Sequence, residues 1–169
     1  MAKKGESKRR GKKPATPEGV RLRLAGLCAR SEQCENDLRQ KIARTGLSKD
    51  DSDAIIEFLR DNKYLDEHRF ARAYCMDKVR FAGWGIMKIR QGLMAKRVPA
   101  AIISEAVGEI DRKEYIAALK RVGIAKARTL DLHTADDRGK FYRYMAARGF
   151  ETSLISRLQA AILKKLDSE

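Results

Sequence analysis

Apolar residues recur every three or four positions along nearly the whole chain from Thr16 onward. That spacing places them on one face of an α-helix, and the alternating β-branched runs that indicate strands are absent from the sequence. Thr16 and Pro17 suit the capping position and the first position of a helix. Gly46, Gly83 and Gly149 fall where apolar periodicity ends, as expected for left-handed C-terminal caps. The pattern predicts an all-α protein.

Three segments of the chain share one arrangement of apolar residues. The sequence "DLRQKIARTGL" begins at residue 37, "KIRQGLMAKRV" at residue 88 and "KFYRYMAARGF" at residue 140. Chance similarity between amphipathic helices is the alternative, but it would not reproduce both the spacing and the glycine found in two of the three segments. The matched positions are Leu38, Ile89 and Phe141, then Ile42, Leu93 and Met145, then Gly46, Arg97 and Gly149, and then Leu47, Val98 and Phe150.

A period near 50 residues is typical of tandem repeats, whose units bury their apolar faces against one another. We therefore expect about nine helices in an elongated, curved array of three three-helix units. The expected units are residues 20–63, 64–112 and 113–169. Residues 1–19 contain seven lysines or arginines and no large apolar residue except Met1. Such a segment cannot bury a core, so we expect a disordered basic tail.

The charge of the whole chain favours anionic partners. Lysine and arginine outnumber aspartate and glutamate by 37 to 23, which gives a net charge of +14. A basic surface of this size attracts polyanions such as nucleic acid, or acidic protein surfaces. The basic start of the chain has no apolar run after it, and no stretch approaches the ~20 apolar residues of a membrane span. We expect a protein that does not bind membranes.

The sequence offers little for catalysis. Cys28, Cys34 and Cys75 are an odd number of cysteines without Cys-x-x-Cys spacing, and we interpret them as reduced thiols of a cytoplasmic protein. We also expect the protein to be a monomer. His68 and His133 lack metal-ligand spacing. No phosphate-binding glycine-lysine loop, Gly-x-Gly-x-x-Gly motif or Gly-x-Ser-x-Gly motif appears. The sequence therefore predicts a non-catalytic protein without a metal or another cofactor.

Residues 64–85, "YLDEHRFARAYCMDKVRFAGWG", combine aromatic and cationic side chains. Phe70, Tyr74 and Phe81 share one face at helical spacing, and we expect these rings in the core. Trp84 stands between two glycines. It either fills the gap between neighbouring units or anchors a contact with a partner, and the sequence leaves both open.

The same segment carries a row of arginines. Arg69, Arg72 and Arg80 fall on a face next to the aromatic one. Guanidinium groups suit the recognition of carboxylates and phosphates, so three in register predict a binding patch.

The motif "YLDEHRFARAY", followed by "GWGIMKIRQGLMAKRV", resembles the signature of the RecX family, bacterial modulators of the RecA recombinase. "CARSEQCENDLRQKIARTGL" is similar to the first repeat of that family and "KFYRYMAARGF" to its third. The resemblance covers residues from about 20 to 165. The chain departs from the family at Ile86, where proline is common, at Arg97, where glycine is common, and at Cys34, which replaces a capping serine or threonine.

The resemblance implies a crescent of three helical repeats that binds in the groove of the RecA filament on single-stranded DNA. It implies inhibition of ATP hydrolysis, strand exchange and filament extension, and so a role in recombination, DNA repair and the SOS response. Cationic residues on the concave face would contact the filament, the DNA or both. Our candidates for this surface are Tyr64, Arg69, Arg72, Arg80, Trp84, Lys88, Arg90, Lys96 and Arg97, with Arg143 and Arg148 in the third unit.

Two other functions fit the residues. A three-helix unit can dock a helix in the major groove, so the protein could be a helix-turn-helix-like module that binds nucleic acid directly. The basic residues are spread over several expected helices, which favours contact with phosphates over the reading of bases. A helical scaffold for an acidic protein outside recombination is the third hypothesis.

Overall fold

The computed structural model describes residues 15–168, and within them the protein forms nine α-helices, one short π-helical segment and no strands. The predicted all-α fold is confirmed. Residues 1–14 of the expected tail lie outside the described part, while its last three residues, 17–19, are helical. The elements are α1 (Pro17–Cys28), α2 (Glu35–Ala43), α3 (Lys49–Asp61), α4 (Glu67–Asp77), the π-helical η1 (Lys78–Ala82), α5 (Ile86–Ala95), α6 (Ala100–Gly108), α7 (Arg112–Ala127), α8 (Ala135–Ala147) and α9 (Thr152–Leu166).

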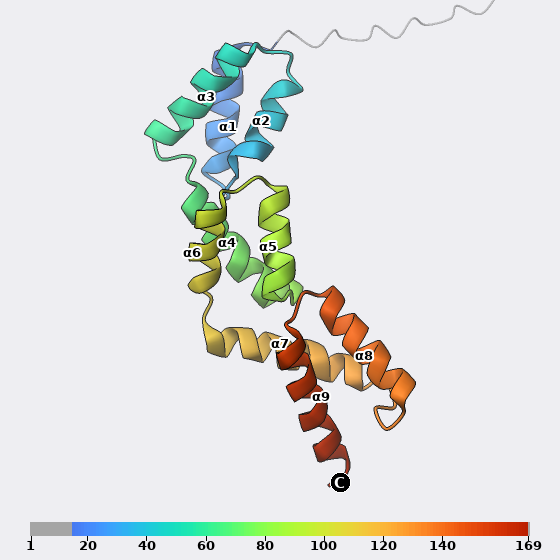
Figure 1. Ribbon diagram of the computed structural model, residues 1–169. Helices are drawn as coiled ribbons and strands as arrows, with labels where there is room; N and C mark the ends of the chain where they lie inside the picture. The colour runs from blue at the N-terminus through green and yellow to red at the C-terminus, as the bar shows by residue number, and fades with distance from the viewer. Residues whose placement is uncertain (1–14, 169) are drawn as a thin grey trace, which may run out of the picture.

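The helices group in threes along an elongated molecule (Figure 1). α1 and α2 pack against α3, α4 packs against α5 and α6, and α7 packs against α8 and α9. We call these groups the first, second and third unit. None of the described helices combines the length and the apolar character that crossing a membrane requires.

The matched positions of the three units have matching environments. The first two positions are 0% exposed in every copy, at Leu38, Ile42, Ile89, Leu93, Phe141 and Met145. The third position has a left-handed backbone in every copy, with φ of +79° at Gly46, +60° at Arg97 and +85° at Gly149. The units therefore repeat both their core and their turn. At Arg97 the turn is strained, since a left-handed residue with a side chain costs about 1–2 kcal/mol.

The predicted cap at Thr16 is present, and two further helices are capped in the same way. The side chains of Thr16, Ser48 and Asp66 each accept a hydrogen bond from an amide in the first turn of the following helix. The cysteines Cys28, Cys34 and Cys75 are buried free thiols, as expected. Burial raises the pKa of Cys34 and that of Cys75 to about 11, so both remain protonated at neutral pH.

The units are joined in two different ways. Buried residues of the second and third units form one continuous apolar cluster, which includes Leu93, Tyr115 and Phe141. Buried residues of the first unit form a separate cluster around Leu24 and Leu59. Cys34, at the start of α2, packs in the cluster of the other two units. The third unit is thus fused to the second by a shared core.

Backbone contact holds this fused junction together. The amide of Gly85 donates to the carbonyl of Arg148 at 2.8 Å, and the amide of Met87 donates to the carbonyl of Gly149 at 3.0 Å. A Cβ on Gly85 would lie 2.2 Å from the carbonyl carbon of Gly149. The glycine after Trp84 is therefore required because another backbone passes against it.

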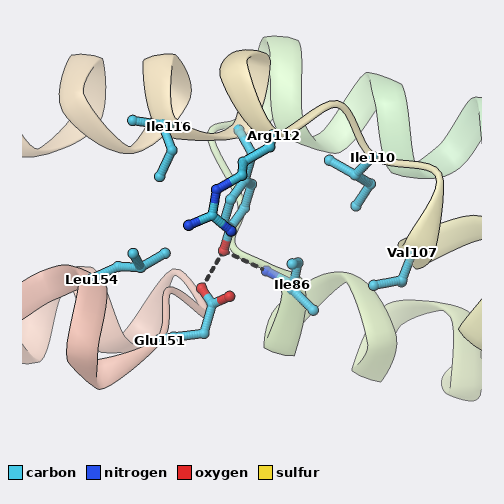
Figure 2. A pocket seen from close by; sticks show the side chains of 8 residues that line it. Ile86, Val107, Ile110, Arg112, Ile116, Glu151 and Leu154 are labelled. Carbon is cyan, nitrogen blue, oxygen red and sulfur yellow. Dashed lines mark hydrogen bonds between the residues drawn. The ribbon is translucent and has the colours of Figure 1, made fainter.

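A buried tyrosine reinforces the junction. The Tyr115 hydroxyl donates to the carboxylate of Glu151 and accepts the amide of Ile86 at 3.1 Å, beside a small cavity (Figure 2). Burial, with the bond to Glu151, raises the pKa of Tyr115. A proline in place of Ile86 has no amide to donate. The departure from the family pattern at Ile86 therefore adds a hydrogen bond between units.

One predicted core residue is at the surface. Phe70 is 8% exposed, but Phe81 is 83% exposed, so the prediction that Phe81 lies in the core is wrong. The α-helical spacing fails here because α4 continues into the π-helical η1, whose wider i to i+5 turn shifts every later side chain around the axis. Val79 points into the core instead, at 1% exposure.

Candidate functional site

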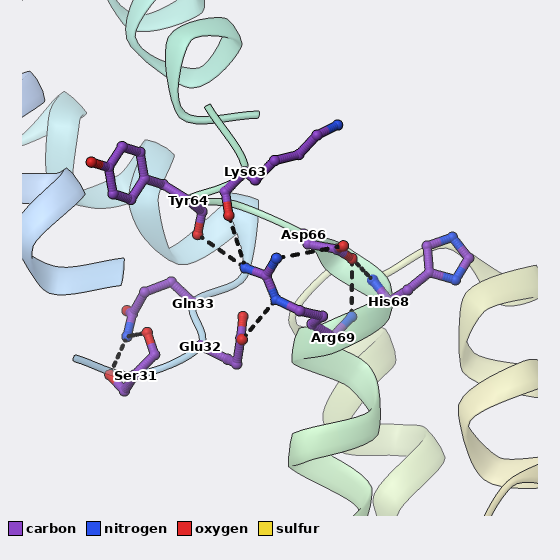
Figure 3. A network of polar contacts seen from close by, with 8 residues as sticks. All are labelled: Ser31, Glu32, Gln33, Lys63, Tyr64, Asp66, His68 and Arg69. Carbon is purple, nitrogen blue, oxygen red and sulfur yellow. Dashed lines mark hydrogen bonds and ion pairs between the residues drawn. The ribbon is translucent and has the colours of Figure 1, made fainter. Parts of the chain in front are cut away.

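The predicted arginine patch on the second unit is a set of internal cross-links. Arg69 reaches back to the first unit, where its Nε donates to Glu32 at 2.8 Å and its Nη2 to the carbonyl of Lys63 at 3.1 Å (Figure 3). The hydrogen bond to Glu32 raises the pKa of Arg69. This guanidinium therefore joins two units.

The other two arginines are also paired. Arg72 lies 3.5 Å from Glu109 and 3.9 Å from Glu105, both on or directly after α6. Arg80, on η1, forms a two-pronged ion pair with Glu114 of α7, with N–O distances of 2.7 and 3.1 Å. Each of the three arginines therefore faces a carboxylate on a different neighbouring element, and a role of these arginines in binding stays a prediction.

Two further candidates connect units as well. The Lys96 ammonium lies 2.5 Å from the carboxylate of Asp37 in α2. Burial by itself raises the pKa of Asp37, but hydrogen bonds from Lys96 and Cys34 outweigh it and leave the pKa lowered. In the third unit, Arg148 donates to the carbonyl of Ala82 at 3.0 Å. Both cations therefore act as links across the two junctions.

The aromatic candidates lie at the edge of the packed interior. Trp84 is half-buried against the shared core, and its ring lies between the ammonium groups of Lys88, at 4.7 Å, and Lys78, at 5.3 Å. This position matches the hypothesis that Trp84 fills the gap between units. Tyr64 is 37% exposed and stacks on Phe58 of α3, with ring centroids 6.5 Å apart.

The remaining candidates lack an acidic partner. Within residues 15–168, Lys88, Arg90, Arg97 and Arg143 form no ion pair with an acidic side chain. The hydrogen bonds of Lys88 and Arg90 are long, at 3.5 Å. We call these four residues the outward cations. They stand on or directly after α5 and on α8, which lie toward the same side of the molecule in Figure 1.

Apolar side chains accompany the outward cations on α5. Met87 and Met94 are 53% and 65% exposed. With Arg90 and Arg97 they follow one another at intervals of three and four residues, which places them along one face of the helix. We call Met87, Arg90, Met94 and Arg97 the α5 stripe. Sequence reasoning selected its cations and missed its methionines, although their helical spacing was visible.

The described residues show no sign of a metal centre. Among them, no group of three or more histidine, cysteine, aspartate or glutamate side chains is arranged to hold an ion. The features that stand out are exposed charge, exposed methionine and an exposed phenylalanine on an array of helical units. The fold and surface therefore define a class: a helical-repeat protein with cationic and apolar side chains at its surface.

Comparison with known proteins finds relatives that are similar over most of the chain. The family model described as "RecX, second three-helix domain" matches residues 66–107. A curated protein named Regulatory protein RecX from Ralstonia pickettii is 29% identical over 151 residues, which cover 87% of this chain and 90% of that protein. One of the same name from Vibrio campbellii is 29% identical over 130 residues, covering 77% and 83%. Over most of its length the chain is therefore similar to RecX regulatory proteins, and residues 66–107 match a RecX domain.

Solved structures agree on the fold. The crystal structure of RecX from Lactobacillus salivarius superposes with a TM-score of 0.74 at 15% identity, covering 90% of this chain and 97% of that one. A second crystal structure, of a regulatory protein RecX, gives a TM-score of 0.73 at 17% identity, covering 85% and 71%. At this identity the likeness shows the arrangement of the helices alone.

Proposed function

We propose that this protein binds the filament that RecA forms on single-stranded DNA and inhibits its ATP hydrolysis, strand exchange and extension. It acts as a monomer in the cytoplasm, by binding and without catalysis, and so regulates recombination, DNA repair and the SOS response. The observation that carries the proposal is the similarity to RecX regulatory proteins over most of the chain, joined to an elongated array of helical units. Such arrays bind along extended partners.

We assign the contact surface by separating the cations that join units from those that have no acidic partner. Arg69, Arg80, Lys96 and Arg148 set the shape of the array, because each joins one unit to the next. The outward cations carry unneutralised charge to the surface, where guanidinium groups bind carboxylates or phosphates. The contact with the filament is therefore assigned to the α5 stripe and to Arg143 in the third unit.

Exposed apolar residues give this surface its affinity. Methionine adapts to irregular partner surfaces, and large apolar side chains that become buried dominate binding energy. Phe81, at 83% exposure, projects from the π-helical turn that precedes α5. Helical π turns occur often at functional sites. Phe81 therefore joins Met87 and Met94 as an anchor, while Trp84 packs against the shared core.

Inhibition follows from the length and the stiffness of the array. The second and third units share one core, so they engage a partner as a single body. A ligand that binds one filament state better than another shifts the population toward that state. A rigid array that contacts neighbouring filament subunits holds them in one arrangement, and cycles of ATP hydrolysis and strand exchange slow.

ATP hydrolysis by the cognate RecA filament tests the proposal. The wild-type protein should lower the hydrolysis rate as its concentration rises. The triple variant Arg90→Gln, Arg97→Gln and Arg143→Gln removes three outward cations, each of which contributes about 0.5–1 kcal/mol at an exposed contact. Its half-inhibitory concentration should rise roughly 10- to 150-fold. An unchanged hydrolysis rate with excess wild-type protein would refute the proposal.

A matched control distinguishes the effect of the proposed contact surface from the effect of net charge. Lys49→Gln, Lys113→Gln and Arg157→Gln remove the same charge at exposed positions that form no ion pair within the described residues. This variant should inhibit like the wild type. If it is weakened as much as the first triple variant, overall charge and not the α5 face governs binding.

A further inference from the structure

The first unit contains a basic groove that sequence reasoning did not select. The groove has a volume of about 390 Å³ and lies between α1 and α2. Leu24 and Leu27 form its apolar part. Four cations line the rest: Arg23 on α1, Arg30 in the turn after α1, Lys41 on α2 and Arg44 directly after α2. No acidic residue lines it.

The charge of this groove is not neutralised from nearby. Within residues 15–168, none of its four cations forms an ion pair or a side-chain hydrogen bond, and all four are exposed. The closest acidic candidate along α2 is Asp37, one turn before Lys41, and its carboxylate is bound by Lys96 at 2.5 Å. The groove therefore keeps four positive charges that face solvent.

The arginines of the second unit differ from these four cations, because they are paired. Arg69, Arg72 and Arg80 each face a carboxylate within 3.5 Å, which neutralises their charge. Four like charges around one groove repel one another, and an anion in the groove relieves that repulsion. The first unit, and not the conspicuous middle segment, holds four unpaired cations around one groove.

We propose that this groove binds the phosphodiester backbone of a nucleic acid strand. Cations on both walls can contact successive phosphates, and the forked guanidinium groups of Arg23, Arg30 and Arg44 fit phosphate oxygens with two hydrogen bonds each. Leu24 and Leu27 offer an apolar surface to sugars and bases. The lining holds no asparagine or glutamine that would read base edges, so binding is independent of sequence.

A single strand is a better occupant than an acidic protein surface. Phosphates recur at a fixed short spacing and carry condensed counterions, whose release favours binding to a cluster of cations. Carboxylates on a protein have no such regular spacing and hold no condensed counterions. The binding does not depend on the proposed function, because it takes place on free nucleic acid without the recombinase.

The test is the affinity of the full-length protein for a fluorescent 20-nucleotide poly-dT strand, followed by anisotropy from about 50 to 200 mM salt. In the variant Arg23→Gln, Arg30→Gln, Lys41→Gln and Arg44→Gln, the affinity at 50 mM salt should fall at least tenfold. Four lost phosphate contacts should make the slope of log affinity against log salt shallower by about 3, since each contact to a single strand contributes about 0.7.

The control removes the same charge elsewhere. Lys49→Gln, Lys113→Gln, Arg157→Gln and Lys164→Gln change exposed positions outside the groove, and this variant should keep the wild-type slope to within about one unit. The basic residues before Thr16 are present in all three proteins, so they cancel in the comparison. Circular dichroism at 222 nm verifies that each variant is folded.

Two results would overturn the inference. One is a groove variant whose affinity and salt slope match those of the control. The other is displacement of the labelled strand by poly-aspartate as effectively, per charge, as by unlabelled poly-dT, which would assign the groove to acidic proteins. Inhibition of the RecA filament is measured separately, so a failure here leaves the proposed function standing and the reverse is also true.

Discussion

The junction between the second and third units makes a sharp prediction about Gly149. This residue has φ of +85°, and a Cβ there would lie 2.3 Å from the amide nitrogen of Lys88. Gly149→Ala therefore introduces two separate costs. The left-handed backbone costs about 1 kcal/mol with a side chain. The close contact forces the backbones apart and disrupts the hydrogen bonds of Gly85 and Met87, at about 1 kcal/mol each.

Gly149→Ala should therefore lower the free energy of unfolding by about 3 kcal/mol in total. Substitutions of two other glycines measure the two costs separately. Gly46 occupies the equivalent position of the first unit, with φ of +79° and nothing within 4 Å of a built Cβ. Gly46→Ala should therefore cost only the backbone term, about 1 kcal/mol. Gly85 has an ordinary φ of −81° but a blocked Cβ. Gly85→Ala should cost only the contact term, about 2 kcal/mol.

Urea unfolding followed by circular dichroism measures all three variants. The fluorescence of Trp84, the one tryptophan of the chain, reports on the junction itself. Its spectrum should change in Gly149→Ala and Gly85→Ala and remain native in Gly46→Ala. If Gly149→Ala loses no more stability than Gly46→Ala, the close backbone approach does not hold the units together and the reasoning fails.

Two further predictions concern single residues at unit boundaries. Arg97→Gly should raise the free energy of unfolding by about 0.5–1 kcal/mol, because it relieves a left-handed φ of +60°. The same change should weaken filament inhibition. Urea unfolding and the ATPase assay measure the two effects, and a loss of stability would contradict the first. Asp37→Asn should cost about 0.5–1 kcal/mol at pH 7, where the Lys96 pair is intact. Since the pKa of Asp37 is lowered in the folded state, the stability from the pair is present above the unfolded pKa of about 4 and is lost as pH falls through the folded value. The gap between wild type and variant should therefore narrow as pH falls below about 4, and a gap that stays as wide as at pH 7 would exclude the pair as its cause.

Local pattern was sufficient to predict the architecture. The spacing of apolar residues predicted helices, and the matched segments predicted three units whose shared positions, such as Leu38, Ile89 and Phe141, are all fully buried. Gly46 and Gly149 were recognised as left-handed caps for the same reason. These features depend on hydrogen bonds and side-chain periodicity within a few turns of one chain segment, so the order of residues contains them.

The candidate surface could be predicted only in part. Arg90, Arg97 and Arg143 were selected from the sequence and do carry outward charge, whereas Arg69 and Arg80 proved to be cross-links. A guanidinium looks the same in the sequence whether it faces solvent or a carboxylate. The partner of Arg80 is Glu114, 34 residues away on the next unit.

The sequence by itself determined the helices, their caps and their grouping into three related units, because each of these is a local consequence of spacing. Only the tertiary structure decided which cations remain unpaired, since an ion pair depends on which elements meet in space. It also turned Phe81 outward, because a π-helical turn shifted the side chains after it. The tertiary structure also decided the basic groove, since two helices must lie side by side to form it. Its cations are Arg23, Arg30, Lys41 and Arg44.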